Sequence, residues 1–449
     1  MTPAQTREWN RVTVANEIHD AVVLGAGISG LVSASILHDQ GCQKILVIDQ
    51  FDKLGGNHID RELNGYTFDI GSLIFQDDSP LLRHFPELLE HYVPIEPEWG
   101  KLTPQGKIAQ YPLSIKKDIL ESGVGGCLRI AFSVLYARLF HREIKNARDF
   151  ARYWIGDYFL NRSGLESYMK RFFGIPAQAV DLEFAEKRML WIKDHARLGK
   201  LFRYLRPHPQ SAPTNRQLAR PQAGFDALYS VAASTLRERG TVFELGQRVD
   251  RICKINNGFL LKLGDREVIA RRIISTIPIN LALAACGMEP DPGLSSVSLI
   301  SLYFSFCGER GFDCSILYNF SNDGSWKRLT VYSDFYGRVN GREYFGVEVI
   351  ASHAGNSISL AEQNFRDHVS HNKLFAGNLQ FEGGQFVHCA YPVYTDNAQE
   401  KAEAAGRRLR SFGVESFGRQ GGFDYQPTAR VSTLTAEANL ERTTAPRAS

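Results

Sequence analysis

Hydrophobic positions change their period early in the chain. Residues 21–24 are wholly apolar, which is typical of a strand buried on both faces of a parallel sheet. Residues 31–37 then repeat apolar side chains at helical spacing without a helix breaker, and residues 44–48 form a second strand-like run. The order strand, helix, strand predicts a βαβ unit at the start of the fold.

The turn between the first predicted strand and the helix has the spacing GxGxxG. In this motif Gly25 allows a tight turn, Gly27 lets the backbone approach a pyrophosphate, and Gly30 lets the helix pack on the strand. The pyrophosphate lies at the helix N-terminus, where N–H groups lack partners. An ordinary glycine-rich turn is the alternative, but the flanking strands and Asp49, placed to accept from a ribose hydroxyl, favour a dinucleotide site. The residues of the loop are Gly25, Gly27, Ile28, Ser29 and Gly30.

Further along, the pattern predicts a helical block and then strands. A helical region reaches about residue 205, and residues 207–222, with four prolines, are predicted to form a loop. A helix opens at residue 223, and alternation between residues 297 and 349 predicts an antiparallel sheet. Short strands are expected at 241–245, 248–253, 258–263, 267–270 and 272–278. Pro392 confines any strand through it to a sheet edge, and a helix is expected at 397–411.

Length and composition set the broad class. A chain of 449 residues with 43% hydrophobic and 22% charged residues is expected to be a soluble protein of two domains. The net charge of +3 argues against nucleic acid or another polyanion as a partner. Seven scattered cysteines without a C-x-x-C pair favour reduced thiols, a cytoplasmic location and no metal site. The first twenty residues lack the apolar core of a signal peptide.

One apolar run, Cys127–Phe140, needs separate treatment. It is shorter than the roughly 18–20 residues that span a bilayer, and it carries Arg129 and Arg138. We therefore predict no transmembrane segment and a buried helix of the second domain. The alternative is a face that rests on a membrane and reaches a lipid-linked substrate.

Beyond Asp49, the chain resembles the FAD-binding pattern of the flavin amine oxidase superfamily. The resemblance rests on the glycine loop, the acid, the Gly55-Gly56-Asn57 segment and the run Asp69-Ile-Gly71-Ser72. It implies FAD as the cofactor and an α/β fold in which a Rossmann-type FAD-binding domain is interleaved with an α+β substrate domain. The implied division is 1–80, 223–290 and 395–449 for FAD, and 81–222 and 291–394 for substrate. The cofactor contacts implied in this part of the chain are Gly55, Gly56, Asn57, Gly71 and Ser72.

Later segments extend the resemblance over most of the chain. In the family, the backbone of a valine matching Val249 holds the adenine ring, at the opening of a strand. Residues 275–278 match the return of the chain to the cofactor domain. The segment 418–425 resembles the C-terminal part of the FAD site, in which Arg419 can bond phosphate and Gly421 permits a close approach.

Within the superfamily, three functions remain open. A protoporphyrinogen oxidase-like group implies hydride transfer from a small-molecule substrate to FAD. A group similar to UDP-galactopyranose mutase implies chemistry on a nucleotide sugar in polysaccharide biosynthesis, but Leu73 and Gln76 stand where the mutase has histidines. A non-catalytic flavoprotein is the third. No catalytic residue is assigned; Tyr111, Tyr332 and Tyr391 are candidates to line a substrate pocket.

Overall fold

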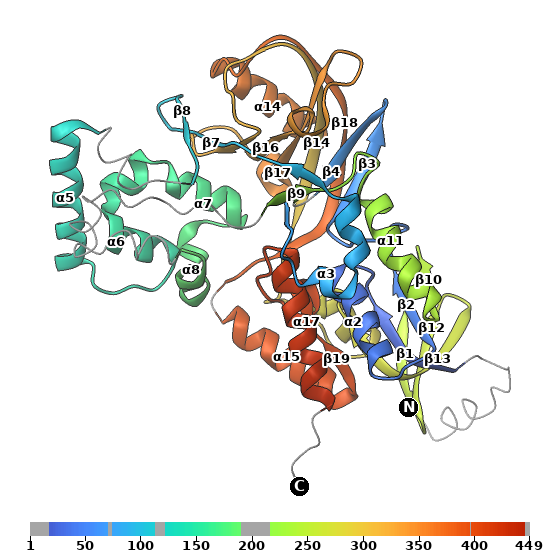
Figure 1. Ribbon diagram of the computed structural model, residues 1–449. Helices are drawn as coiled ribbons and strands as arrows, with labels where there is room; N and C mark the ends of the chain where they lie inside the picture. The colour runs from blue at the N-terminus through green and yellow to red at the C-terminus, as the bar shows by residue number, and fades with distance from the viewer. Residues whose placement is uncertain (1–17, 71–73, 113–121, 190–215, 396, 445–449) are drawn as a thin grey trace.

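The first sheet of the molecule is mainly parallel. The computed structural model describes residues 18–70, 74–112, 122–189, 216–395 and 397–444 (Figure 1). Its first sheet has the order β10-β2-β1-β13-β12-β11, and β19 also pairs with β13. The contacts between β10, β2, β1, β13 and β19 are parallel, and those of β12 are antiparallel. The strands are β1 Ile18–Leu24, β2 Ile45–Asp49, β10 Thr241–Leu245, β11 Arg251–Ile255, β12 Gly258–Leu263, β13 Arg266–Ser275 and β19 Val414–Ser416.

Helices cover both faces of this sheet because the second half of β1, residues 21–24, is apolar at every position. Val23 points into one core and Val22 into the other, as alternation along a strand requires. The Val23 core is completed by α2 (Ile28–Asp39), α11 (Phe225–Glu238) and α17 (Ala429–Thr444). The Val22 core is completed by α12 (Ile279–Ala285) and α15 (Ala398–Phe412). This three-layer arrangement confirms the predicted α/β class and Rossmann-like unit.

A second sheet, with the order β18-β14-β17-β16-β15-β7-β8, lies above the first in Figure 1. Its pairs are antiparallel except for β15 with β7, and β18 ends at Pro392 on the sheet edge, as expected. Helix α14 (Ile358–His371) packs on one face, and the hairpin β3–β4 packs on the other. The strands are β3 Ile59–Leu63, β4 Tyr66–Ile70, β7 Trp99–Leu102, β8 Ile108–Gln110, β14 Ser296–Arg310, β15 Ile316–Asn319, β16 Trp326–Val331, β17 Glu343–Ile350 and β18 Phe375–Pro392.

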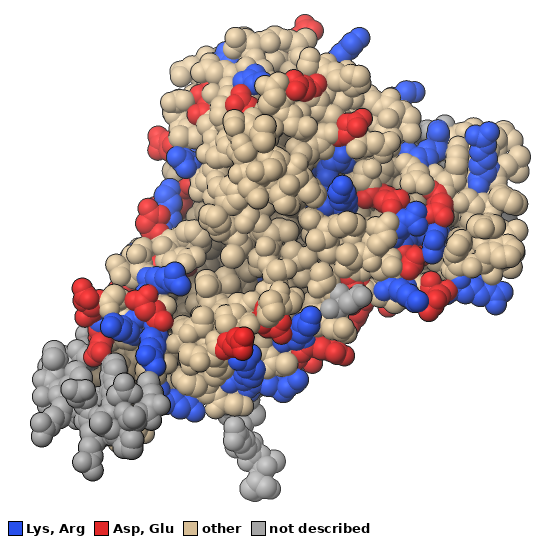
Figure 2. Space-filling model, turned by 180° about the vertical axis from the view of Figure 1, so that it is seen from behind, with Lys and Arg blue, Asp and Glu red and all other residues tan. Residues whose placement is uncertain are grey.

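Four helices form a block that projects from the rest of the molecule (Figure 1). They are α5 Gly123–Phe140, α6 Ala147–Arg162, α7 Leu165–Phe173 and α8 Leu182–Arg188, with the 3₁₀ turn η3 Ala177–Ala179. Figure 2 shows side chains of both signs interspersed over the face that it displays. The remaining short elements are β5 Phe75–Gln76, β6 Val93–Ile95, β9 Gln217–Ala219, α3 Leu81–His84, η2 Pro86–His91, α13 Ser333–Tyr336, η4 Ala351–Ala354 and α16 Gly418–Gly421.

Three local expectations are wrong. The apolar helix α5 is not buried: only 11% of it lies inside the molecule, and it begins at Gly123, which makes it 18 residues long. That length and composition are enough to cross a membrane. Strand β11 begins at Arg251, so Val249 lies in the preceding loop. The two strands expected at 267–270 and 272–278 are one strand, β13, because both halves pair with β1.

The domain boundaries stay a prediction, but the packing bears on one of them. Leu81, Phe85 and Leu88 lie in the same core as α2 and α11. The first eight residues of the segment assigned to the substrate domain therefore help to cover the first sheet.

Buried His368 makes the stability of the second-sheet region sensitive to acid. Its Nδ1 accepts a hydrogen bond of 2.9 Å from Trp326 Nε1, which requires an unprotonated nitrogen. Burial, together with nearby Arg171, lowers the pKa of His368 from 6.5 to about 4. Because the folded pKa lies below the unfolded one, this stabilisation is complete above pH 6.5 and is lost as the pH falls towards 4. At pH 4.5 the loss through His368 is roughly 2–3 kcal/mol relative to pH 7.

We expect His368→Gln to flatten this dependence, since glutamine keeps an acceptor for Trp326 and does not titrate. Urea unfolding at pH 7 and pH 4.5 measures the difference in the free energy of unfolding. The same loss on acidification in the wild type and in His368→Gln contradicts the assignment.

Candidate functional site

A groove runs along the carboxyl ends of β1 and β2, where ligands bind in open α/β sheets. Its volume is about 240 Å³. The loops that form it come from five distant parts of the chain, and the C-terminal segment around Arg419 closes one end. The predicted site residues that line it are Gly25, Gly27, Ile28, Ser29, Asp49, Gly55, Gly56, Asn57, Val249 and Arg419.

Two glycines show why this groove needs a bare backbone. A Cβ on Gly30 would overlap the carbonyl oxygen of Gly25, so Gly30 is required for α2 to pack at the end of β1. A Cβ on Gly27 would meet Gly56 Cα at 3.5 Å, an ordinary van der Waals contact. The fold therefore tolerates a small side chain at Gly27. A larger side chain there would fill the open groove without disturbing the fold.

The N-terminus of α2 faces the groove with free donors. Gly27 is the N-cap residue, no side chain in the described part of the chain caps the helix, and the first intrahelical bond runs from Leu31 N to Gly27 O at 2.9 Å. The amides of the first turn, which include Ile28 and Ser29, are therefore available to an anion. This is the arrangement expected for a pyrophosphate.

Asp49 is more engaged with the protein than the sequence indicates. Its Oδ2 accepts from Ala26 N at 2.7 Å, and its Oδ1 accepts from Phe51 N at 2.9 Å. Burial raises the pKa of Asp49, and these backbone donors oppose that rise. Each carboxylate oxygen has a second lone pair, so Asp49 can both order the glycine loop and accept from a ribose hydroxyl.

Two of the predicted contacts do not line the groove. Gly30 lies beneath it, and Gly421 packs against Ser275 O, which a Cβ would approach to 2.7 Å. Gly71 and Ser72 lie outside the described residues. Val249 reaches the groove from its loop because Gln247 N donates to Asp49 O at 2.9 Å and fixes the loop across the end of β2.

Unpaired polar atoms in the groove match a polar ligand. Gln420 Oε1 and Gln426 Oε1 are buried and have no hydrogen-bond partner in the described part of the chain. Arg419 forms no ion pair with a carboxylate among the same residues, and burial lowers its pKa. A long ligand with phosphate and hydroxyl groups offers partners to all three, so the groove fits a dinucleotide such as FAD.

A second cavity of about 380 Å³ adjoins the groove, and Asn57, His388 and Arg419 line both. It lies between the first domain, the second sheet and the helical block, where an interleaved substrate domain was expected to bind substrate. Aromatic side chains form much of its wall: Trp99, Phe172, Phe173, Phe184, Tyr318, Tyr391, Tyr394 and Tyr425. Its volume is within the usual range for small-molecule sites.

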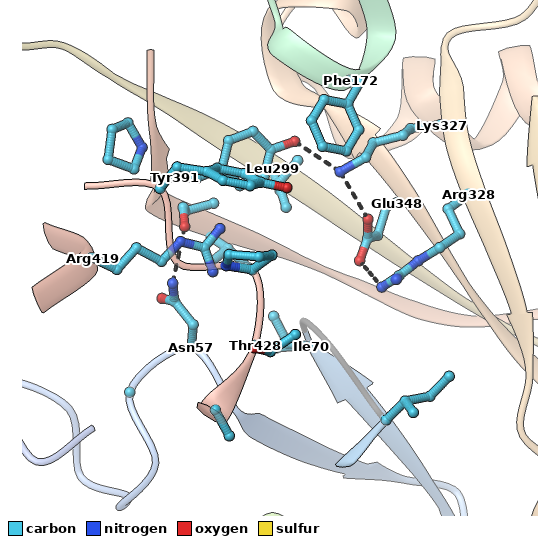
Figure 3. Close-up of a pocket in the computed structure, with 18 of the residues that line it drawn as sticks. Asn57, Ile70, Phe172, Leu299, Lys327, Arg328, Glu348, Tyr391, Arg419 and Thr428 are labelled. Atoms are coloured by element: carbon cyan, nitrogen blue, oxygen red, sulfur yellow. Dashed lines mark hydrogen bonds and ion pairs between the residues drawn. The ribbon is translucent and has the colours of Figure 1, made fainter. Parts of the chain in front are cut away.

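A chain of charged side chains crosses this cavity (Figure 3). Lys327 Nζ donates to Tyr391 Oη at 3.1 Å and lies 3.4 Å from Glu348 Oε2. Glu348 also pairs with Arg328, which lies directly opposite it across β16 and β17. A bulge between Trp326 and Arg328 shifts the register, so the adjacent Lys327 and Arg328 both line the cavity rather than opposite faces of the sheet.

The charges in this cluster hold each other ionised. Burial opposes charge on Lys327, but Tyr391 and Glu348 outweigh it and raise the pKa of Lys327. Burial likewise acts to raise the pKa of Glu348, and Arg328 and Lys327 outweigh it and lower that pKa. The cavity therefore keeps its cations and its carboxylate at neutral pH.

Comparison with known proteins agrees with this geometry. Residues 23–88 match the family model described as an NAD(P)-binding Rossmann-like domain. Protoporphyrinogen oxidase 1 of Arabidopsis thaliana is 24% identical over 314 residues, which are 64% of this chain and 57% of that protein, so the match spans under two thirds of the relative. The crystal structure of reduced UDP-galactopyranose mutase aligns at a TM-score of 0.75 and 17% identity, covering 95% of this chain and 94% of that chain. Cyclohexylamine oxidase of Brevibacterium oxydans aligns at a TM-score of 0.61 and 15% identity, covering 95% and 99%.

The chain has the fold of the FAD-dependent amine oxidase-like superfamily. The expectation drawn from the glycine loop and the later segments is confirmed at this level. For the cavity beside the dinucleotide groove, the prediction from the sequence was incomplete. It named Tyr391 but gave no role to Lys327, Arg328 or Glu348. Tyr111 stacks on Tyr318 behind the wall, with ring centroids 4.3 Å apart, and Tyr332 lies in the core of the second sheet.

Two substitutions in the glycine loop of this amine oxidase-like fold separate cofactor binding from folding. We expect Gly27→Val to fold with a thermal midpoint near that of the cofactor-free wild type and to lose bound dinucleotide, because its side chain occupies the groove. Gly30→Ala, in contrast, is expected to destabilise the whole protein, since its Cβ overlaps Gly25. Circular dichroism melting and absorbance of the purified variants measure the two effects. Full cofactor content in Gly27→Val contradicts the placement of the pyrophosphate.

Proposed function

We propose that this protein is an FAD-dependent oxidoreductase that takes a hydride from a small anionic substrate. The groove residues Gly27, Ile28, Ser29 and Arg419 hold the dinucleotide, and the adjoining cavity holds the substrate. When bound, FAD supplies the hydride acceptor. The likeness to protoporphyrinogen oxidase 1 and to flavoenzyme structures supports this class of reaction.

The charge of the cavity is the observation from which we infer the class of substrate. Among the described residues that line it, four are cationic, namely Lys327, Arg328, Arg419 and Arg430, and one, Glu348, is acidic. Arg430 pairs with Asp78, and Arg419 is assigned to the dinucleotide, which leaves the two cations Lys327 and Arg328 facing one carboxylate. Buried cations in excess are unfavourable unless an anion joins them. A carboxylate or phosphate on the substrate supplies that anion.

The chain's own residues orient such a substrate. Lys327 and Arg328 are fixed by Glu348 and Tyr391, so their donors are held in place before the substrate arrives. Aromatic side chains around them exclude water and hold a flat or apolar substrate body. Arg419 lies against the Tyr391 ring, 5.6 Å from its centroid, at the junction of groove and cavity.

The same charge separates this protein from its amine oxidase neighbours. Cyclohexylamine and putrescine, named as substrate or ligand of such neighbours, are amines and carry positive charge at neutral pH. A cavity with surplus cations repels them. The shared fold therefore does not extend to a shared substrate class.

A mutase-like reaction on a nucleotide sugar is the second candidate. It is favoured by the likeness to UDP-galactopyranose mutase and by the same surplus of cations, which suits a diphosphate. Against it stands Gln76, which lines the cavity where the mutase has histidine; Leu73 lies outside the described residues. The two candidates differ in the state of the flavin. The mutase-like reaction starts from reduced flavin and oxidises nothing overall, whereas the oxidoreductase starts from oxidised flavin and oxidises its substrate.

Benzoate and benzylamine test the sign of the charge in the cavity, since the two compounds share a ring and differ in charge. We expect FAD-loaded protein to bind benzoate at least tenfold more tightly than benzylamine, measured by the change in visible flavin absorbance. Lys327→Gln should weaken benzoate binding roughly tenfold, because it removes one cation while retaining a donor for Tyr391. Glu348→Gln should not weaken it.

Lys262→Gln, on an exposed position of β12 remote from the cavity, is the matched control and should change neither ligand. Tighter binding of benzylamine than of benzoate by the wild type contradicts an anionic substrate, whatever the variants do.

A further inference from the structure

Helix α5 is fixed to the helical block along one side only. Ile130 and Ala137 are buried on that side. Tyr158 N donates to Ser133 Oγ at 3.0 Å, and the Arg138 guanidinium lies 5.6 Å from the ring centroid of Trp154. At Gly156 a Cβ would come within 2.7 Å of Ser133 Oγ, so α6 approaches α5 closely there. These contacts hold α5 flat against the block.

The opposite side of α5 is a continuous apolar surface. It lies at the outer edge of the block, away from both sheets (Figure 1). Of the fourteen large hydrophobic side chains that are exposed in the described part of the chain, seven lie on this helix. At about 100° per residue they fall within roughly 160°, which is less than half of the helix circumference. We name this set the α5 face: Val124, Leu128, Phe132, Leu135, Tyr136, Leu139 and Phe140.

The charges at the α5 face are of one sign. Residues 123–142 contain three arginines and no acid. Arg138 turns inward to the block, whereas Arg129 and Arg142 are exposed at the margin of the face. Beyond the helix, Lys145 is paired with Glu143 at 3.0 Å, which cancels its charge. An apolar strip bordered by arginines that form no ion pair with any described residue matches a surface with a hydrocarbon interior and an anionic boundary.

We propose that the α5 face docks this protein on an anionic lipid bilayer, with α5 lying in the plane of the interface. The apolar side chains enter the acyl region, and Arg129 and Arg142 meet lipid phosphates. Tyr136, apolar in its ring and polar at its hydroxyl, suits this depth.

Crossing the bilayer is a different arrangement and does not fit the packing. α5 is long and apolar enough to span by composition, but its inner side is bonded to α6. Inserting it would strip Ile130, Ala137 and Arg138 from their partners. A second copy of the chain is also a poorer occupant, because two faces that carry only positive charge repel, whereas lipid phosphates attract.

Vesicle co-sedimentation of the full-length, FAD-loaded protein tests the docking. The vesicles are phosphatidylcholine alone or with 30% phosphatidylserine. We expect binding to the anionic vesicles at least tenfold stronger than to the neutral ones, reduced by 0.5 M salt. Leu128→Ser with Phe132→Ser, and separately Arg129→Gln with Arg142→Gln, should each lower the partition coefficient at least tenfold.

The control variant is Leu360→Ser, which alters an exposed leucine on α14 and should leave binding unchanged. All four changed positions are exposed, so flavin content and melting should match the wild type. Failure to bind anionic vesicles overturns the proposal, as does equal binding by the Leu128/Phe132 variant. A dimer in vesicle-free buffer that the same variant dissociates, measured by analytical ultracentrifugation, assigns the face to a second copy instead.

Discussion

The site depends on one close approach of backbone to backbone, where Gly30 of α2 meets the Gly25 carbonyl at the end of β1. That contact seats the N-terminus of α2 at the edge of the first sheet. It also places Gly27 against Gly56, and Asp49 then ties the loop down through Ala26 N. The C-terminal segment with Arg419 closes the groove from the other side. A side chain at Gly30 would displace all of these together.

The cavity beside the groove depends on a second, smaller feature of the backbone. A β-bulge in β16 turns Lys327 and Arg328 to the same side, and Glu348 holds both. The close contact between Gly30 and Gly25 belongs to the shared fold and indicates the cofactor. The bulge sets the charge of the cavity, and we propose that this charge sets the class of substrate. A common fold can then bind amines in some proteins and an anion here.

The sequence predicted the parts whose signals are local. The strands, the glycine loop and Asp49 lie within thirty residues of each other, and their apolar pattern determines the βαβ unit. The Lys327–Glu348–Tyr391 contact joins three strands, and the bulge breaks the alternation that would place Lys327 on the opposite face. Helix α5 was wrongly expected to be buried because an apolar pattern shows that a face avoids water but not what covers it.

We propose that the groove holds FAD and that the cavity delivers an anion to be oxidised. The most direct measurement is the visible spectrum of the purified protein, followed without oxygen as acidic and basic metabolite fractions are added. The account predicts a flavin band near one equivalent per chain, bleached by a component of the acidic fraction. A colourless protein, or bleaching by the basic fraction alone, would contradict it.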